Sequence, residues 1–268
     1  MVAPTLHFLH FARRPRVTTP RVLIVAGSDS GGGAGIQADV KTVTMLGGHA
    51  MTAITAITAQ NTLGVSAVMP VPAEIVLAQI DACLSDIGAD AVKIGMIGSA
   101  EVAHAVADRL AGLGVPVVFD PVMIATSGSV LADPATVAAF GRLMARATVV
   151  TPNLPELAAL GGRGAVLDHG CHLAEKGGHI EGAQVIDRLF APDGTLLREL
   201  SADRIDTGST HGTGCTFASA LATGLAQRRP IADAFERAVA FVRLAIARAP
   251  GLGAGHGPLG QQFVTEFR

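Results

Sequence analysis

The stretch "VLIVAGSDSGGGAGIQADV", residues 22–40, starts with an apolar run. A glycine-rich loop follows, and after it apolar residues recur at regular intervals. The run at 22–27 has the length and β-branched content of a buried strand. After the glycines, Ile36 and Val43 recur at helical spacing, and Gly47 follows as a stop signal. A strand, a glycine loop and a helix in this order predict the first half of a parallel crossover unit.

Strand-like and helical patterns alternate along the rest of the chain. Each apolar run is followed by an amphipathic segment long enough to return the chain to the next parallel strand. A hairpin is expected to turn at Asp193-Gly194, and two helices close the chain. The further strand-like runs cover residues 51–59, 91–98, 115–122 and 147–153, and the closing helices cover about 213–228 and 231–249.

The sequence predicts one domain of the α/β class. No internal repeat, linker or change of composition divides it, and hydrophobic residues make up 49% of the chain. We therefore expect residues 21–268 to form a single three-layer α/β/α domain with a mostly parallel central sheet. Residues 1–20 contain no acidic residue and are expected to be a disordered extension.

Composition excludes several classes of function. The net charge is −2, from 20 basic and 22 acidic side chains, and neither Trp nor Tyr occurs, so we expect no nucleic-acid partner. No apolar run approaches the roughly 18 residues that span a bilayer. Cys83, Cys171 and Cys215 are too far apart for a zinc pattern or a disulfide framework, which favours a reducing cytoplasm.

Polar residues cluster where the predicted strands end, which is where ligands bind in such folds. The loop at 26–35 is neither a P-loop nor GxGxxG, so a Rossmann oxidoreductase is disfavoured. Its glycines allow a ligand to approach the backbone. Asp39 is either a surface acid or a polar anchor for that ligand. Gln60-Asn61 is either a turn or a carboxamide that recognises the donor and acceptor edge of a flat heterocycle.

Four further residues suit phosphate and Mg²⁺. In "TPNLPE" (151–156), Asn153 either caps a helix or joins Glu156 in holding hydrated Mg²⁺. Asp120, at another strand end, is the natural third member of that group. Lys176 precedes two glycines and is either a solvated charge or a partner for phosphate oxygens.

The most specific motif is "THGTGCT", residues 210–216. Amides at a helix start are unpaired and attract anions, and Gly212 and Gly214 permit the tight curl that aims them at one point. That arrangement suits a transferring phosphoryl group. At such a helix start Cys215 is expected to have a lowered pKa and to accept a proton from a substrate hydroxyl; the alternative is a small buried cysteine.

These motifs, in this order, resemble the hydroxymethylpyrimidine/phosphomethylpyrimidine kinases of thiamine biosynthesis, in the ribokinase superfamily. The resemblance implies ATP- and Mg²⁺-dependent phosphorylation of 4-amino-5-hydroxymethyl-2-methylpyrimidine to its monophosphate and then its diphosphate, in a homodimer. The stretches that carry it are "AGSDSGGGAGIQADVKT", "TAITAQNTLGV", "VKIGMIG", "DPVM", "TPNLPE", "KGGH", "STHGTGCT" and "GLGAGHGP".

The resemblance also implies roles for individual residues. Cys215 would be the base, with the amides of Gly212, Thr213, Gly214 and Cys215 as the anion hole, assisted by Lys176. The pyrimidine would be held by Gly27, Asp39, Thr58, Gln60 and Met96. Nucleotide phosphates would meet Asn153, Lys176, Thr207 and His211, and the metal would meet Asp120 and Glu156.

The sequence departs from the family pattern in three places. The segment before Lys176 is short, Glu175 stands where an apolar strand residue is usual, and Val239 stands where relatives often carry a lysine. Two alternatives therefore stay open: a pyridoxal kinase of the same superfamily, and a non-catalytic pyrimidine-binding protein with an impaired nucleotide site.

Overall fold

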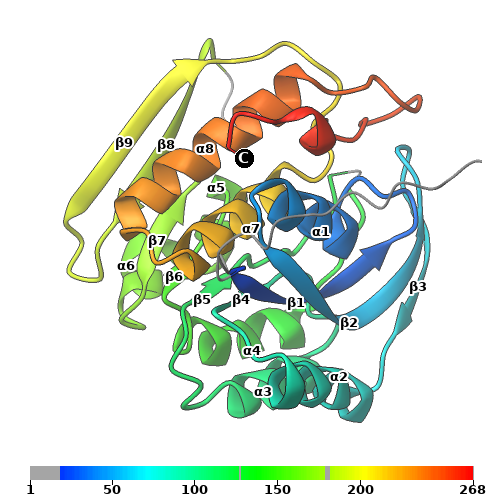
Figure 1. Cartoon of the computed structure of the whole chain (residues 1–268), viewed down its shortest axis with the longest axis vertical. Helices are drawn as coiled ribbons and strands as arrows, with labels where there is room; N and C mark the ends of the chain where they lie inside the picture. Colours follow the sequence, from blue (N-terminus) through cyan, green and yellow to red (C-terminus); the bar gives the residue numbers. More distant parts are fainter. Residues whose placement is uncertain (1–18, 127, 179–181, 268) are drawn as a thin grey trace, which may run out of the picture.

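The computed structural model of the chain describes residues 19–126, 128–178 and 182–267. Its centre is a sheet with the strand order β3-β2-β1-β4-β5-β6-β7-β8-β9 (Figure 1). The run from β2 to β7 is parallel, and β3, β8 and β9 pair antiparallel at the two edges. The strands are β1 (Arg21–Asp29), β2 (His49–Gln60), β3 (Val65–Pro70), β4 (Ala91–Ile94), β5 (Val117–Phe119), β6 (Val149–Val150), β7 (His172–Glu175), β8 (Gln184–Phe190) and β9 (Leu196–Asp203).

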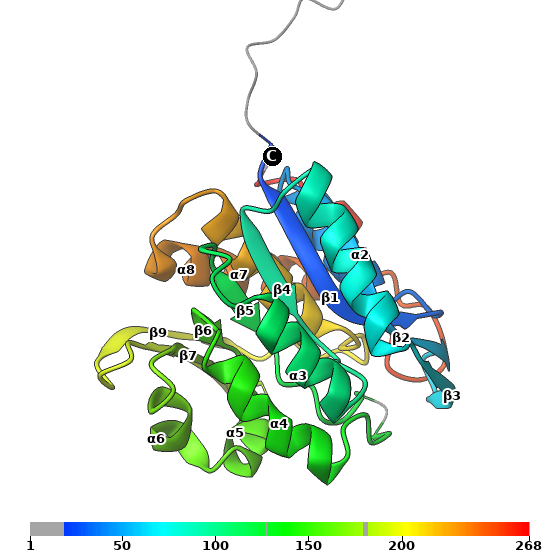
Figure 2. The same ribbon diagram turned by 90° about the horizontal axis from the view of Figure 1, so that it is seen from below.

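Helices cover both faces of the sheet (Figures 1 and 2). On one face lie α1 (Gly35–Met45), α7 (Thr213–Ala226), α8 (Ile231–Ala247) and the short η1 (Gln261–Phe263). On the other lie α2 (Ala73–Asp86), α3 (Ala100–Arg109), α4 (Pro134–Met144), α5 (Leu154–Ala159) and α6 (Gly162–Leu167). The expected three-layer α/β/α fold is confirmed. Within the described residues, no helix is both long and apolar enough to cross a membrane.

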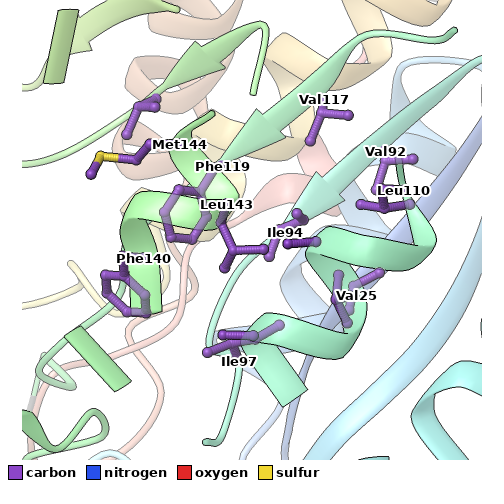
Figure 3. Packing of buried hydrophobic residues seen from close by; sticks show 14 of the residues in the cluster. Val25, Val92, Ile94, Ile97, Leu110, Val117, Phe119, Phe140, Leu143 and Met144 are labelled. Carbon is purple, nitrogen blue, oxygen red and sulfur yellow. The ribbon is translucent and has the colours of Figure 1, made fainter. Parts of the chain in front are cut away.

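Two apolar clusters hold the layers together, one on each side of the sheet. Figure 3 shows part of the cluster beneath α3 and α4, where Val25, Ile94 and Phe119 of the sheet meet Leu143 and neighbouring side chains. The Phe119 and Phe140 rings pack edge to face with centroids 5.2 Å apart. Burial of side chains this large on both faces makes the sheet a rigid platform for whatever its strand ends carry.

The structure corrects several element boundaries. The runs at 91–98 and 147–153 form strands only at Ala91–Ile94 and Val149–Val150. Residues 95–98 and 151–153 leave the sheet at its carboxyl edge, and the second of these segments carries the polar side chains of Thr151 and Asn153 there. The segment before Lys176, where the sequence pattern fades, forms α5, α6 and β7, which short apolar runs alone do not distinguish.

Site residues gather at one edge because the parallel strands all end there. β2 and β4 flank β1 on opposite sides, and the chain crosses to opposite faces of the sheet after β1 and β4. Such a topological switch point opens a crevice at the strand ends. Gly27 of β1 and Met96, just beyond β4, meet there.

Candidate active site

The turn that leads into α7 can be made only with glycine. Gly212 has φ of 88°, and a Cβ atom added there would lie 2.0 Å from the carbonyl oxygen of Gly33. The turn therefore presses against the first glycine loop. Helix geometry leaves the first amides of α7, from Thr213 to Cys215, without partners inside the helix. These N–H groups and the positive end of the helix dipole face the strand ends.

Lys176 and Asp120 lie at this turn, as the sequence predicted. The Lys176 Nζ is 2.8 Å from Asp120 Oδ1, and a Cβ atom at Gly214 would lie 3.2 Å from that nitrogen and 3.3 Å from Asp120 Oδ2. Thr151 donates to the same carboxylate at 3.1 Å. Burial lowers the pKa of Lys176, but the carboxylates of Asp120 and Glu156 outweigh it and raise that pKa overall. Lys176 is therefore a fixed ammonium ion beside the helix start.

The loop that carries Lys176 is rigidly held. The Gly177 amide donates to Asp187 Oδ1 at 2.9 Å, and a Cβ atom at Gly177 would lie 2.0 Å from the carbonyl oxygen of Ile186. Asn153 forms a bridge with Lys176 in parallel register. His179, the end of the KGGH motif, lies outside the described residues.

Glu175, the charged departure before Lys176, is buried but paired. Arg163 of the short segment approaches its carboxylate to 3.0 Å, and Arg188 of β8 to 3.5 Å. The guanidinium of Arg163 also stacks on the Phe190 ring, 3.9 Å from its centroid. A buried carboxylate needs such partners. The shortened segment thus supplies the counter-charge that β7 requires, and Lys176 keeps its place.

Asn153 caps α5, so the simpler of its two interpretations holds in this structure. Its side chain accepts from the Glu156 amide at 2.8 Å, and Glu156 Oε2 accepts from the Asn153 amide at 2.8 Å. Burial, and after it the charge of Asp120, raise the pKa of Glu156 to about 7, although Lys176 lowers it.

The carboxylates of Asp120 and Glu156 fit Mg²⁺ only when nucleotide phosphates supply further ligands. Asp120 disfavours the ionised form of Glu156, and a cation at the site relieves that repulsion. Within the described ranges, no group of three His, Cys, Asp or Glu side chains is arranged to hold a metal. A hydrated Mg²⁺ that takes its remaining ligands from nucleotide phosphates suits two carboxylates.

The predicted lowering of the Cys215 pKa is wrong. Burial of the thiol is the largest influence and raises its pKa to about 11. Lys93 and the Gly35 amide oppose this increase, while Asp39 and Asp120 add to it. The prediction considered only the helix start and omitted desolvation and the two acids that the fold brings close. In the ligand-free protein Cys215 is a thiol at neutral pH.

Asp39 is neither a surface acid nor an accessible anchor for a ligand. Its side chain has no exposed surface and contacts Lys93 Nζ at 2.8 Å through Oδ2. Ser219, one turn beyond Cys215 in α7, donates to Oδ1 at 2.7 Å. A side chain without exposed surface does not touch a ligand in this conformation, so Asp39 acts through Lys93.

Lys93 is the main residue that the sequence analysis missed. It is fully buried in β4, and the acids around it, Asp39 first, outweigh the effect of burial and raise its pKa. The signal was present: a lysine inside the apolar run "AVKIG" (91–95) has no reason to be there unless it is paired.

The predicted substrate residues lie on the other side of the glycine turn. A Cβ atom at Gly27 would lie 2.5 Å from Met96 Cε, so the Met96 side chain covers the end of β1. Thr55 donates to the Met96 carbonyl at 2.6 Å and fixes that segment. Gly35, at φ of 55°, lies against the Gly27 carbonyl.

Gln60, Thr58 and His211 form one polar cluster with Asp29. Thr58 Oγ1 is 2.9 Å from the Ser28 carbonyl and 3.0 Å from Gln60 Oε1. The Gln60 Nε2 is 3.2 Å from His211 Nε2, which is 3.0 Å from Asp29 Oδ2. Asp29 was missed, although an acid inside a glycine loop, "SDSGGG" (28–33), is typical of a side chain that binds its own loop amides.

Two nucleotide candidates, His211 and Thr207, form their hydrogen bonds with groups other than Lys176. His211 points toward Asp29 and Gln60, as described above. Thr207 accepts from the Ser209 amide at 3.0 Å and closes a small turn. Asn61 likewise accepts from the amides of Leu63 and Gly64, so at that position the turn interpretation holds.

Comparison with known proteins agrees with this geometry. The profile described as Phosphomethylpyrimidine kinase matches residues 29–260, which is most of the chain. The chain belongs to this family. A hydroxymethylpyrimidine/phosphomethylpyrimidine kinase of Rhizobium meliloti is 48% identical over 258 residues, which cover 90% of this chain and 96% of the relative.

Two further proteins that are similar to this chain extend the picture. The thiamine biosynthesis bifunctional protein ThiED of Geobacter sulfurreducens is 44% identical across 99% of this chain, which spans 57% of that longer protein. The pyridoxal kinase of Staphylococcus aureus, solved with AMP-PCP and pyridoxal, superposes with a TM-score of 0.83 at 31% identity, covering 92% of this chain and 95% of that one. The higher identity of the pyrimidine kinases favours that activity over the pyridoxal alternative.

Proposed function

We propose that the protein transfers the γ-phosphoryl group of ATP to hydroxymethylpyrimidine and then to its monophosphate, in thiamine diphosphate biosynthesis. One observation carries the proposal: Lys176 Nζ lies 2.8 Å from Asp120 Oδ1 at the start of α7, where a Cβ atom at Gly214 would lie within 3.3 Å of both side chains. Amides without partners inside the helix, one ammonium ion and an acid together suit a phosphoryl group in transfer and its metal.

The residues divide into two sets on either side of Gly212. The set with Lys176, Asp120, Asn153 and Glu156 is proposed to face the nucleotide. Asp120 and Glu156 are proposed to hold Mg²⁺, which neutralises phosphate charge when bound. The set with Gly27, Met96, Thr58 and Gln60 is proposed to hold the pyrimidine ring, whose hydroxymethyl group then points at the glycine turn.

Cys215 is proposed to take the proton from the attacking hydroxyl. For this it must first be a thiolate, and Lys93 and the Gly35 amide are the groups that favour this form. The amides of Gly212, Thr213, Gly214 and Cys215 are proposed to stabilise charge on the phosphoryl oxygens as the oxygen–phosphorus bond forms.

The test is a coupled kinase assay on the purified chain with Mg-ATP. Hydroxymethylpyrimidine and its monophosphate should both be phosphorylated, each with a kcat/KM well above that for pyridoxal. Absence of turnover with both pyrimidines would refute the proposal. Faster phosphorylation of pyridoxal would establish the second candidate, which the structural likeness to the Staphylococcus aureus enzyme supports.

We further propose that the active species is a cytoplasmic homodimer. The three free cysteines lie in separate places: Cys83 in α2, Cys171 directly before β7 and Cys215 in α7. Cysteines that form no disulfide suit a reducing compartment. Sedimentation velocity at micromolar concentration should give a single species at twice the 27.2 kDa of the chain. A monomer that remains fully active would exclude the dimer as a requirement.

A further inference from the structure

His211 lies at the junction of the two glycine loops, on the substrate side. Its imidazole is 7% exposed, and a Cβ atom at Gly33 would lie 2.4 Å from its Cδ2. The ring packs directly against Gly33, which in turn packs against Gly212. The imidazole Nε2 lies between Asp29 and Gln60.

Asp29 determines which nitrogen of His211 carries a proton. Its Oδ2 accepts from the amides of Gly33 and Ala34 at 3.0 and 2.8 Å, and Oδ1 accepts from Gly31 at 2.8 Å. Burial alone raises the Asp29 pKa, but His211 and these amides outweigh it and hold the pKa below its usual value. An ionised carboxylate only accepts, so the His211 Nε2, 3.0 Å away, must carry a hydrogen.

Thr58 sets the same kind of limit at the opposite end of Gln60. The Ser28 carbonyl only accepts, so the single hydroxyl hydrogen of Thr58 goes to it across 2.9 Å. Thr58 Oγ1 is then left to accept from Gln60. The single Nε2–H of His211 lies between Asp29 Oδ2 and Gln60, and because this nitrogen has no free lone pair, Gln60 can present only an acceptor to it.

Both neighbours thus require the same orientation of the Gln60 carboxamide: nitrogen toward Thr58 and oxygen toward His211. The carboxamide as drawn has Oε1 3.0 Å from Thr58 and Nε2 3.2 Å from His211. A half-turn about the last torsion exchanges two groups of similar size without changing the packing. Hydrogen counting at both ends therefore selects the exchanged form.

We propose that His211 is a specificity-determining residue, which locks the carboxamide of Gln60 in one orientation so that the site accepts an aminopyrimidine edge and rejects its inverse. The inference rests on the proposed function for the identity of the ring. An aminopyrimidine offers a ring-nitrogen acceptor beside an amino donor. A locked carboxamide matches that order only one way round, whereas a free one adapts to either order.

The probe is a pair of ligands that differ only at this edge. The first is hydroxymethylpyrimidine, and the second is its analogue with a ring carbonyl in place of the amino group, which reverses donor and acceptor. Calorimetry without nucleotide should show that the wild type binds the amino form about 10²-fold more tightly. His211→Phe should narrow that ratio to below about tenfold, because the carboxamide can then turn.

Three companion variants make the test specific. Thr58→Val removes the other end of the lock and should narrow the ratio in the same way, and it serves if His211→Phe fails to fold. His211→Gln retains an N–H donor and should keep most of the discrimination. His256→Phe alters an exposed histidine on the neighbouring loop, 3.3 Å from Thr210, and should leave the ratio unchanged.

The outcomes separate this inference from the proposed function. If His211→Phe and Thr58→Val weaken both ligands by the same factor, the cluster is only structural and the inference is overturned. If the wild type binds neither ligand, the proposed substrate is wrong. If it discriminates between them but phosphorylates neither, the kinase proposal fails while the role of His211 stands.

Discussion

Two lysine–aspartate ion pairs lie near Cys215, each with a distance of 2.8 Å between the lysine Nζ and a carboxylate oxygen. The two pairs serve different purposes. Lys93–Asp39 has no exposed side-chain surface, whereas Lys176 is 14% exposed and its partner Asp120 is 2% exposed. The inner pair is sealed between β4, α1 and α7. The outer pair opens on the glycine turn that is proposed to hold phosphate.

This difference in exposure sets what each pair can do. A buried ion pair that is closed to solvent cannot exchange partners. Its charges therefore exert a constant electrostatic effect on Cys215, and the pair is a structural unit. An ion pair at the edge of a cavity can exchange its partner for phosphate or metal without burying a free charge. The same two residue types therefore yield a permanent support in one place and a working site in the other.

The largest effect is expected from the outer pair. Lys176→Met should lower kcat roughly 10³-fold, about 4 kcal/mol, because one charge that stabilises the transferring phosphoryl group is lost. Unfolding free energy should fall less than in a Lys93→Met variant, because Lys176 is partly exposed and Thr151 still donates to Asp120. Steady-state kinetics and urea unfolding measure the two quantities, with the exposed Arg146→Met as the matched control. If Lys176→Met lowered the unfolding free energy but kept the kcat of the folded enzyme, Lys176 would be a structural residue and not a catalytic one.

The inner pair should show the opposite balance. Lys93→Met leaves Asp39 buried without its counter-charge and should cost about 3 kcal/mol of unfolding free energy. Adding Asp39→Asn to that variant should recover part of the loss, since a neutral side chain then replaces the unpaired acid. Urea unfolding of both variants is the measurement. Equal stability of Lys93→Met and the wild type would show that the pair is not a structural unit.

The residue between the pairs should affect chemistry without affecting binding. Cys215→Ala is expected to lower kcat by about 10²-fold, the range of a general base, and to leave the pyrimidine dissociation constant largely unchanged. Cys83→Ala, on α2 across the sheet, is the control and should keep full activity. An unchanged kcat in Cys215→Ala would remove the thiol from the reaction.

The smallest effect is a pH dependence. Because the pKa of Cys215 is raised to about 11, the thiol form predominates at neutral pH and the thiolate fraction increases about tenfold per pH unit. The kcat/KM of the wild type should therefore rise with a slope near one between about pH 7.5 and pH 9. A flat profile over that range would mean that Cys215 does not supply the base.

The sequence by itself determined the fold class and placed most of the residues that are proposed to bind phosphate at one edge of the sheet. Strand–loop–helix alternation places every loop that follows a parallel strand at one edge, and so Asp120, Asn153 and Lys176 were predicted from order alone. Gly212 carried the turn, because few other residues adopt its positive φ, and Gly214 leaves room for Lys176 and Asp120 beside the helix start. Local patterns suffice where geometry is set by neighbours in the chain.

Only the tertiary structure decided the electrostatics. Lys93, Asp39 and Ser219 belong to three different elements, and their pairing under Cys215 has no local signal beyond one lysine in an apolar strand. The same holds for His211, which contacts Asp29 across 182 positions of sequence. Desolvation and charge act through space, so the protonation state of Cys215 and the orientation of Gln60 depend on contacts that only the folded chain creates.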